Sequence, residues 1–180
     1  MRSPTNSGPC VGKVPAEAGT ARFATSAIEG AVPVAFGLSV ALPGIPVVFA
    51  GDEFGLTGSV GEEARTPMPW DSVDDAADTI ELYAATIALR TGHIALNEGG
   101  IRWLHASNDV LVFVREHAEE SVLVVAARAT FDVLLEPTAV AGSPTVLLGG
   151  AVATRDAAGL RLAGTGPSFT AWHLPGVAVS

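Results

Sequence analysis

A turn, a short apolar run and a pair of carboxylates follow one another without a break between residues 42 and 53. Residues 46–50 hold a β-branched and aromatic run that is short enough for a buried strand. Because the run is apolar on successive residues, we expect it to be covered on both faces, as in a parallel sheet between helices. Asp52 and Glu53 come where such a strand would emerge, which is where barrel enzymes and open α/β sheets place their chemistry. The same residues also fit a buried strand that ends in a solvated acidic turn.

Two helices are predicted on either side of this strand. Residues 32–42 are apolar nearly all round, which is typical of a buried helix. Residues 79–91 carry apolar side chains at intervals of three and four, with Asp78 as the predicted N-cap and Gly92 as the residue that ends the helix. The loop 51–77 is long, and loops of that length are usually functional or disordered. The two helices and the strand predict an α/β arrangement.

From Gly99 onward the period of the apolar residues changes to two. Short strands at regular spacing predict a small antiparallel β-sandwich, with a boundary near residues 97–100. The predicted strands are 101–104, 110–114, 122–125, 133–135, 145–148, 152–154, 160–162 and 168–174. Trp103 and Trp172 fall in these strands and are expected to serve packing. Because this part carries its own alternating pattern, we expect it to survive alone. The predicted fold class is therefore α/β followed by all-β.

The composition is that of a globular protein, with 48% hydrophobic and 16% charged residues. The formal net charge is −9 and no basic cluster is present, which argues against nucleic acid as a partner. No run of roughly 18 apolar residues exists, so no membrane span is expected. The single Cys10 excludes an internal disulfide and fits a reducing cytosol, so we expect a cytoplasmic protein without a signal peptide. Residues 1–20 are rich in Pro, Gly, Ser and Thr and are expected to be a disordered or non-homologous leader.

Several spaced motifs lie in a fixed order along the first half of the chain. They are Pro43-Gly44-Ile45-Pro46, Gly51-Asp52-Glu53 with Gly55, Arg65, Pro67-Met68-Pro69-Trp70-Asp71, Ile87-Ala88-Leu89-Arg90, His93 and Ala95-Leu96. With these motifs the chain resembles glycoside hydrolase family 13, the α-amylase family, and within it the α-glucosidase, neopullulanase and maltodextrin-glucosidase-type members most. The resemblance is dense between residues 42 and 96 and looser up to residue 174.

The resemblance implies the last α/β unit of a (β/α)8 barrel over residues 21–97 and a β-sandwich C-terminal domain over residues 98–180. A complete barrel needs about 250 residues, and this chain has 180. We therefore expect the C-terminal part of a glycosidase, in a truncated or remodelled gene product. The parent activity that the resemblance implies is hydrolysis of α-glucosidic bonds in malto-oligosaccharides.

The catalytic carboxylates of the family have no counterpart in this chain. The nucleophile and the general acid follow barrel strands that are missing here, and the third carboxylate belongs to a motif whose His and Asp positions fall on Ala18 and Gly19. Asp52 and Glu53 are adjacent, so on an extended chain their side chains point to opposite faces. They make a poor pair for retaining hydrolysis, which needs carboxyl groups about 5–5.5 Å apart. We expect no catalytic residue and no hydrolysis by this chain alone.

Four residues are candidates for substrate binding on the strength of the resemblance. Asp52 and Glu53 either orient sugar hydroxyls or anchor the loop through Arg65, since arginine binds a carboxylate in a bidentate manner. Trp70 either stacks on a glucose ring or packs as a loop anchor. The partner is then an α-glucan or malto-oligosaccharide. The other partners that the sequence allows are a missing barrel portion and a second copy, joined through an unpaired apolar strand edge.

No cofactor and no metal are expected. The acidic loop lacks the spacing of a calcium-binding EF-hand, so helix capping and solvation are the favoured roles of Asp71, Asp74, Asp75 and Asp78. Two rival functions stay open beside the glycosidase, namely a non-catalytic carbohydrate-binding or interaction module and a degenerate gene product. The preference for α-1,4 or α-1,6 bonds, hydrolysis against transglycosylation, and the oligomeric state are also open.

Overall fold

A computed structural model describes residues 30–56 and 67–175 of the chain, with helices in the first half and strands in the second. The helices are α1 (Ala31–Ala41), α2 (Ala77–Gly92) and α3 (Ile94–Asn97), with two 3-10 turns, η3 (Asp52–Phe54) and η4 (Trp70–Ser72). The strands are β1 (Gly100–Ala106), β2 (Val110–Glu116), β3 (Glu120–Ala127), β4 (Phe131–Leu135), β5 (Thr145–Leu148), β6 (Val152–Asp156), β7 (Gly159–Gly164) and β8 (Ser168–Pro175).

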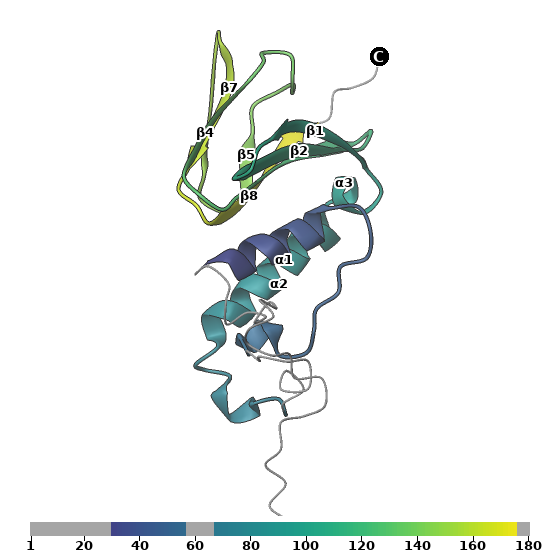
Figure 1. The fold of residues 1–180 in the computed structure, drawn as a ribbon. Helices are drawn as coiled ribbons and strands as arrows, with labels where there is room; N and C mark the ends of the chain where they lie inside the picture. The colour runs from purple at the N-terminus through teal and green to yellow at the C-terminus, as the bar shows by residue number, and fades with distance from the viewer. Residues whose placement is uncertain (1–29, 57–66, 176–180) are drawn as a thin grey trace, which may run out of the picture.

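The strands form two antiparallel sheets. The larger sheet has the order β1-β2-β3-β8-β5, and the smaller sheet has the order β4-β7-β6. Helices α1 and α2 lie side by side against one face of the five-stranded sheet, and the three-stranded sheet lies on the other side (Figure 1). Three layers result, with the five-stranded sheet in the middle.

The middle layer explains why β2 and β3 are apolar on successive residues. One set of side chains, including Val112, Leu123 and Trp172, packs against the three-stranded sheet. The alternate set, including Phe113 and Val124, packs against the helices. A sheet with both faces buried reads as a continuous apolar run instead of a strict alternation. The strands themselves lie where the sequence predicts them.

Close packing brings α1 onto this sheet. The helix is apolar on nearly all sides, and Val40 and Ala41 have no exposed surface. A β-carbon added at Gly37 would lie 2.4 Å from the ring of Phe169, so only glycine permits this approach between helix and sheet. Phe36 stacks on Tyr83 of α2 with ring centroids 4.0 Å apart. Within the part of the chain that the structure describes, no helix combines the length and the apolar character needed to cross a membrane.

The strand predicted over residues 46–50 is wrong. This segment has no regular secondary structure, and Ile45, Val47 and Phe49 are 91%, 80% and 51% exposed. A strand needs a neighbour to pair with its N–H and C=O groups, and none of the strands of the described residues lies beside this segment. The described residues therefore contain the two predicted helices without the predicted strand between them. The leader 1–20 and Arg65 lie outside the described residues, whereas Pro67-Met68-Pro69-Trp70-Asp71 lies within them.

Two smaller corrections concern a helix end and a tryptophan. Helix α2 begins after Ala76, so Asp78 lies in its first turn and is not the N-cap. There its carboxylate still faces the positive end of the helix dipole. Trp172 is buried between the sheets, as expected for a packing residue, whereas Trp103 on the edge strand β1 is half exposed. The ring of Trp103 lies against that of Phe113, at 5.1 Å between centroids.

Candidate functional site

The predicted carboxylates lie in a tight turn that follows the exposed segment. Gly51 has φ 101°, and an added β-carbon there would lie 2.6 Å from Leu56 Cδ1, so this corner requires glycine. Glu53 Oε2 accepts a hydrogen bond from Gly51 N–H at 2.9 Å, and Asp52 Oδ2 accepts one from Phe49 N–H at 3.3 Å. Both carboxylates thus bind the backbone of their own turn. They hold the corner in shape and are not arranged as a catalytic pair.

Trp70 lies in η4 and is 70% exposed, and its ring meets Phe54 of η3 edge to face at 6.0 Å between centroids. An edge-to-face aromatic contact of this kind fixes the orientation of a ring while leaving its faces open. The two 3-10 turns are therefore linked through this aromatic pair. The remaining candidate, Arg65, lies outside the described residues, so its contact with Asp52 and Glu53 stays a prediction.

A hollow of about 270 Å³ opens beside the turn, between the start of α1 and the face of α2. Its lining is mixed, with apolar side chains such as Pro33 and Leu82 and the polar groups of Asp52, Thr79 and Tyr83. Burial raises the pKa of the Tyr83 hydroxyl, and the nearby carboxylates of Asp52 and Glu53 raise it further. This phenol is therefore neutral and available as a hydrogen-bond donor at neutral pH. Of the four candidates, the structure places Asp52 in this hollow.

Two arginines hold the end of α1, namely Arg90, which the sequence analysis names as part of a motif, and Arg115, which it does not name. Arg115 is 1% exposed, and its guanidinium donates to the carbonyl oxygens of Ala41 (2.7 Å), Gly99 (2.7 Å) and Gly100 (3.2 Å). Arg90 donates to the carbonyls of Val40, Leu42 and Gly44. Burial, and to a lesser degree the nearby Arg90, lowers the pKa of Arg115.

Carbonyl groups at a helix C-terminus have no partner within the helix and carry partial negative charge. The two guanidinium groups satisfy them and join α1 to α2 and to the five-stranded sheet. The signal that would have found Arg115 is its place within the same strand, directly after the apolar run Val-Leu-Val-Phe-Val of residues 110–114. A charge at such a position has to find partners in the fold.

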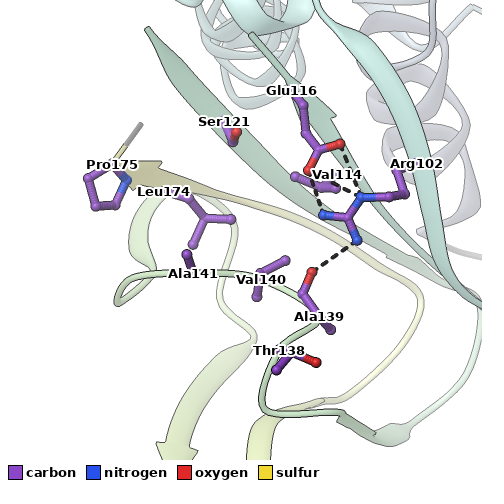
Figure 2. A pocket seen from close by; sticks show the side chains of 10 residues that line it. All are labelled: Arg102, Val114, Glu116, Ser121, Thr138, Ala139, Val140, Ala141, Leu174 and Pro175. Carbon is purple, nitrogen blue, oxygen red and sulfur yellow. Dashed lines mark hydrogen bonds and ion pairs between the residues drawn. The ribbon is translucent and has the colours of Figure 1, made fainter. Parts of the chain in front are cut away.

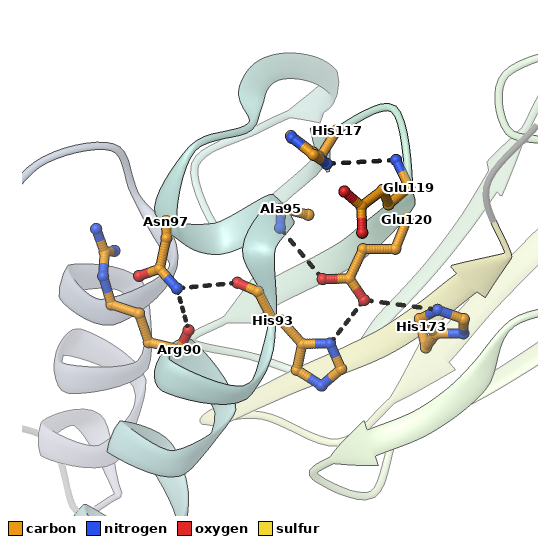
Figure 3. A network of polar contacts seen from close by, with 8 residues as sticks. All are labelled: Arg90, His93, Ala95, Asn97, His117, Glu119, Glu120 and His173. Carbon is orange, nitrogen blue, oxygen red and sulfur yellow. Dashed lines mark hydrogen bonds and ion pairs between the residues drawn. The ribbon is translucent and has the colours of Figure 1, made fainter. Parts of the chain in front are cut away.

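A second polar junction ties the helical layer to the start of β3 (Figure 3). Glu120 Oε1 accepts from Ala95 N–H at 3.2 Å, while Oε2 lies 2.9 Å from His93 Nδ1 and 3.6 Å from His173 Nε2. Burial raises the pKa of Glu120, but the hydrogen bonds from His93 and Ala95 and the nearby histidines outweigh it, so the pKa lies below its ordinary value. Asn97 donates to the carbonyls of Arg90 and His93 and so closes the end of α2. Among the described residues, no group of three or more His, Cys, Asp or Glu side chains is arranged to hold a metal ion.

The amino-acid sequence of this chain is similar to those of known proteins. It is 31% identical over 100 residues to a cyclomaltodextrinase of Geobacillus thermopakistaniensis strain MAS1, covering 54% of this chain and 17% of that protein. It is 32% identical over 112 residues to neopullulanase 2 of Thermoactinomyces vulgaris, covering 59% of this chain and 19% of that protein. The chain thus spans less than a fifth of the length of these curated relatives. No family model matches it.

Solved structures give the same fold. The α-amylase of Geobacillus thermoleovorans, complexed with acarbose, superposes with a TM-score of 0.73 at 19% identity over 86% of this chain and 36% of its own. The debranching enzyme of Nostoc punctiforme superposes with a TM-score of 0.69 at 20% identity, over 80% of this chain and 31% of its own. Together with the sequence matches, this arrangement of two helices and antiparallel sheets makes the chain a relative of glycoside hydrolase family 13, the α-amylase family, over part of the length of those enzymes.

Proposed function

We propose that this chain is the C-terminal part of an α-amylase-family glycosidase that acts on α-glucosidic bonds of malto-oligosaccharides. The observation that carries the proposal is the joint match of one stretch of chain to a cyclomaltodextrinase and a neopullulanase by sequence and to an α-amylase by fold. In this proposal residues 21–97 belong to the catalytic barrel and residues 98–180 form the domain that follows it.

The exposed apolar segment 45–49 supports this assignment. Ile45, Val47 and Phe49 present their side chains to solvent, and such residues in a row on a surface mark a site of contact. In the proposal this segment pairs with further barrel strands of a glycosidase. In the chain by itself the same segment is open to a second copy, which makes self-association the expected behaviour at high concentration.

The 180-residue chain by itself is proposed to be inactive. Asp52 and Glu53 are adjacent and each binds a backbone amide of its own turn, an arrangement that differs from two carboxyl groups flanking one bond. The test is to incubate the purified chain with maltotriose and with 4-nitrophenyl α-glucoside. We expect no release of glucose or nitrophenol above a control without protein, and clear turnover would contradict this part of the proposal.

A chimera tests the positive part. The stretch of the Thermoactinomyces vulgaris neopullulanase that aligns with this chain is replaced by residues 30–175. We expect turnover of a malto-oligosaccharide by this chimera. A matched chimera that also carries Val47→Asp should lose at least about tenfold in rate, since a charge buried between barrel strands is costly. A chimera that folds, judged by its circular dichroism and thermal transition, and yet shows no turnover would contradict the assignment.

A second candidate function, a non-catalytic carbohydrate-binding module, is favoured by Trp70 alone. Its ring is exposed and held edge-on by Phe54, an arrangement that suits stacking against a sugar ring. Calorimetric titration of the chain with maltotriose tests it against the Trp70→Ala variant. Binding that disappears in the variant supports a carbohydrate-binding role for this residue, whereas equal affinity assigns Trp70 to packing.

A further inference from the structure

A hollow of about 210 Å³ lies at one end of the two-sheet stack, far along the chain from the predicted site (Figure 2). Strand register builds its floor. Glu116 on β2 lies opposite Ser121 on β3, and Ser121 lies opposite Leu174 on β8, so the three side chains form one row on the same face of the sheet. Arg102 on β1 lies opposite Val114 and completes this floor. The other wall is the connection between β4 and β5, residues 138–141.

Two arginines hold that wall in place. Arg102 Nη1 donates to the carbonyl of Ala139 at 3.0 Å, while Nε and Nη2 grip the carboxylate of Glu116. From the other side, Arg155 on β6 donates to the carbonyls of Pro137 and Val140. The connection is thus fixed before any ligand arrives. A preformed site avoids the ordering cost that a loose loop would incur on binding.

The charges in the hollow are balanced. Arg102 and Glu116 form an ion pair, so the hollow has no net positive charge to attract an anion and no net negative charge to attract a cation. Polar atoms remain nonetheless. Arg102 commits three of its five N–H groups to the described partners, the Glu116 carboxylate has further lone pairs, and the hydroxyls of Ser121 and Thr138 line the space.

The apolar surface of the hollow is presented by the exposed Ala141 and Pro175, whereas Val140 and Leu174 are 4% and 3% exposed and lie beneath it. A ligand that fits both sides is neutral, carries several hydroxyls along one edge and has a face of C–H groups. The volume of about 210 Å³ lies below the roughly 300–1,000 Å³ of pockets for drug-sized ligands, which favours one ring over a chain of rings. A pyranose has this size, charge and division of surface.

We propose that this hollow binds one glucose unit of a malto-oligosaccharide, with Glu116 and Arg102 on its hydroxyl edge and Ala141 and Pro175 against its C–H face. The choice of glucose among pyranoses rests on the proposed function. The site lies on the β-sheet part of the chain and is separate from Trp70, Asp52 and Glu53. It holds a glucan without cleaving it, because the hollow contains a single carboxylate.

The test is an NMR titration of the ¹⁵N-labelled 180-residue chain with maltose. We expect the amide signals of Ser121, Ala139 and Val140 to shift together and to saturate. Ala141→Phe fills the hollow from an exposed position, and Glu116→Gln removes one charged acceptor while keeping its shape. Each substitution should weaken the affinity for maltose about tenfold or more. Ala141→Phe does so by occupying the space of the ligand, and Glu116→Gln by weakening one or two hydrogen bonds.

Two variants serve as controls. Val152→Phe adds a ring at an exposed position of β6, away from the hollow, and Trp70→Ala removes the aromatic residue of the other candidate site. Neither should change the shifts at Ser121 and Ala139. An Ala141→Phe chain that binds maltose as well as the unaltered one would overturn the proposal, and so would a folded spectrum without saturable shifts at these amides. If the shifts cluster at Trp70 instead, the hollow is refuted while a carbohydrate-binding role for the chain stands. Activity of the chimera is a separate readout, so failure here does not test the glycosidase assignment.

Discussion

Two apolar runs of similar composition differ sharply in how much of their surface is exposed to solvent. Residues 47–49 are Val-Val-Phe and are exposed to between 39% and 80%, whereas residues 122–125 are Val-Leu-Val-Val and are at most 1% exposed. Both read as strands with two buried faces. The difference is that β3 has a helical layer on one side, a second sheet on the other and a strand on each flank. The run at residues 47–49 has none of these among the described residues.

An apolar run therefore predicts that its residues are buried, but it does not identify the residues, of the same chain or of another, that bury them. The cover of the five-stranded sheet on its helix-facing side comes from α1, α2 and α3 of this chain. That layer is fastened by Arg115 and Glu120, whose contacts cross from strand to helix. The helices and the sheets are therefore expected to be stable together and not apart.

The largest effect is expected from removing the helical layer. A piece comprising residues 98–180 would expose Phe113, Val122 and Val124 to water, and burial of such side chains contributes about 1.5–3 kcal/mol each. This revises the expectation from sequence pattern that the β part survives alone. We expect the piece to associate or to lose its cooperative thermal transition, as measured by sedimentation and circular dichroism. A monomeric piece with a sharp transition would show that the cover is dispensable.

The next effect concerns the buried guanidinium. Arg115→Met leaves the carbonyls of Ala41, Gly99 and Gly100 without their donors in a buried place, which costs about 3 kcal/mol or more. Denaturant unfolding measures the loss. Arg128→Met is the matched control, because Arg128 pairs with Asp109 at the surface and such pairs contribute about 0–1 kcal/mol. Equal losses of unfolding free energy in both variants would contradict the stabilising role that the structure gives to Arg115.

The two runs are compared directly by the same substitution in each. Val124→Ala deletes buried methyl groups between sheet and helices and is expected to cost about 2 kcal/mol. Val47→Ala acts on an exposed side chain and should change the free energy of unfolding by no more than about 0.5 kcal/mol. The comparison fails if Val47→Ala is as costly as Val124→Ala in the same denaturant titration.

The smallest effect is a dependence on pH. The pKa of Glu120 is lower in the folded chain than its unfolded value of about 4.3. The ionised carboxylate therefore stabilises the fold above that value, and this contribution is lost as the pH falls through the folded-state pKa. At about pH 6 we expect Glu120→Gln to be less stable by about 1–2 kcal/mol, with a gap that narrows towards pH 3. The exposed neighbour variant Glu119→Gln should show no such gap, and a gap for Glu120→Gln that is constant with pH would contradict this account.

The sequence predicts local secondary structure well, but it predicts poorly which elements pack against one another. The strand positions and the two helices follow from apolar period and turn residues, because these signals are local. The predicted strand at residues 46–50 fails because pairing depends on neighbours that no local pattern reveals. The burial of helices and sheet against each other was missed for the same reason. The continuous apolar runs of β2 and β3 do indicate that both faces of these strands are buried.

For the candidate site, the sequence found the turn but not its internal bonds. Asp52 and Glu53 bind the amides of Phe49 and Gly51, contacts that depend on the backbone of a glycine corner. The hollow at Arg102 could not be foreseen, since it arises from the register of four strands. Residues that are far apart in sequence meet there only once the sheets have formed.

Hydrogen exchange resolved to single amides tests the central claim, which is that the helical layer and the sheets form one folded unit that leaves residues 45–49 uncovered. The amides of Val122 to Val125 should exchange last, through global unfolding, since β3 is paired on both sides and covered on both faces. The amides of Val47 and Val48 should exchange at rates close to those of an unstructured peptide. Protection at Val47 and Val48 equal to that of β3 would contradict the account, because it would place a paired and covered strand where the structure has an open segment.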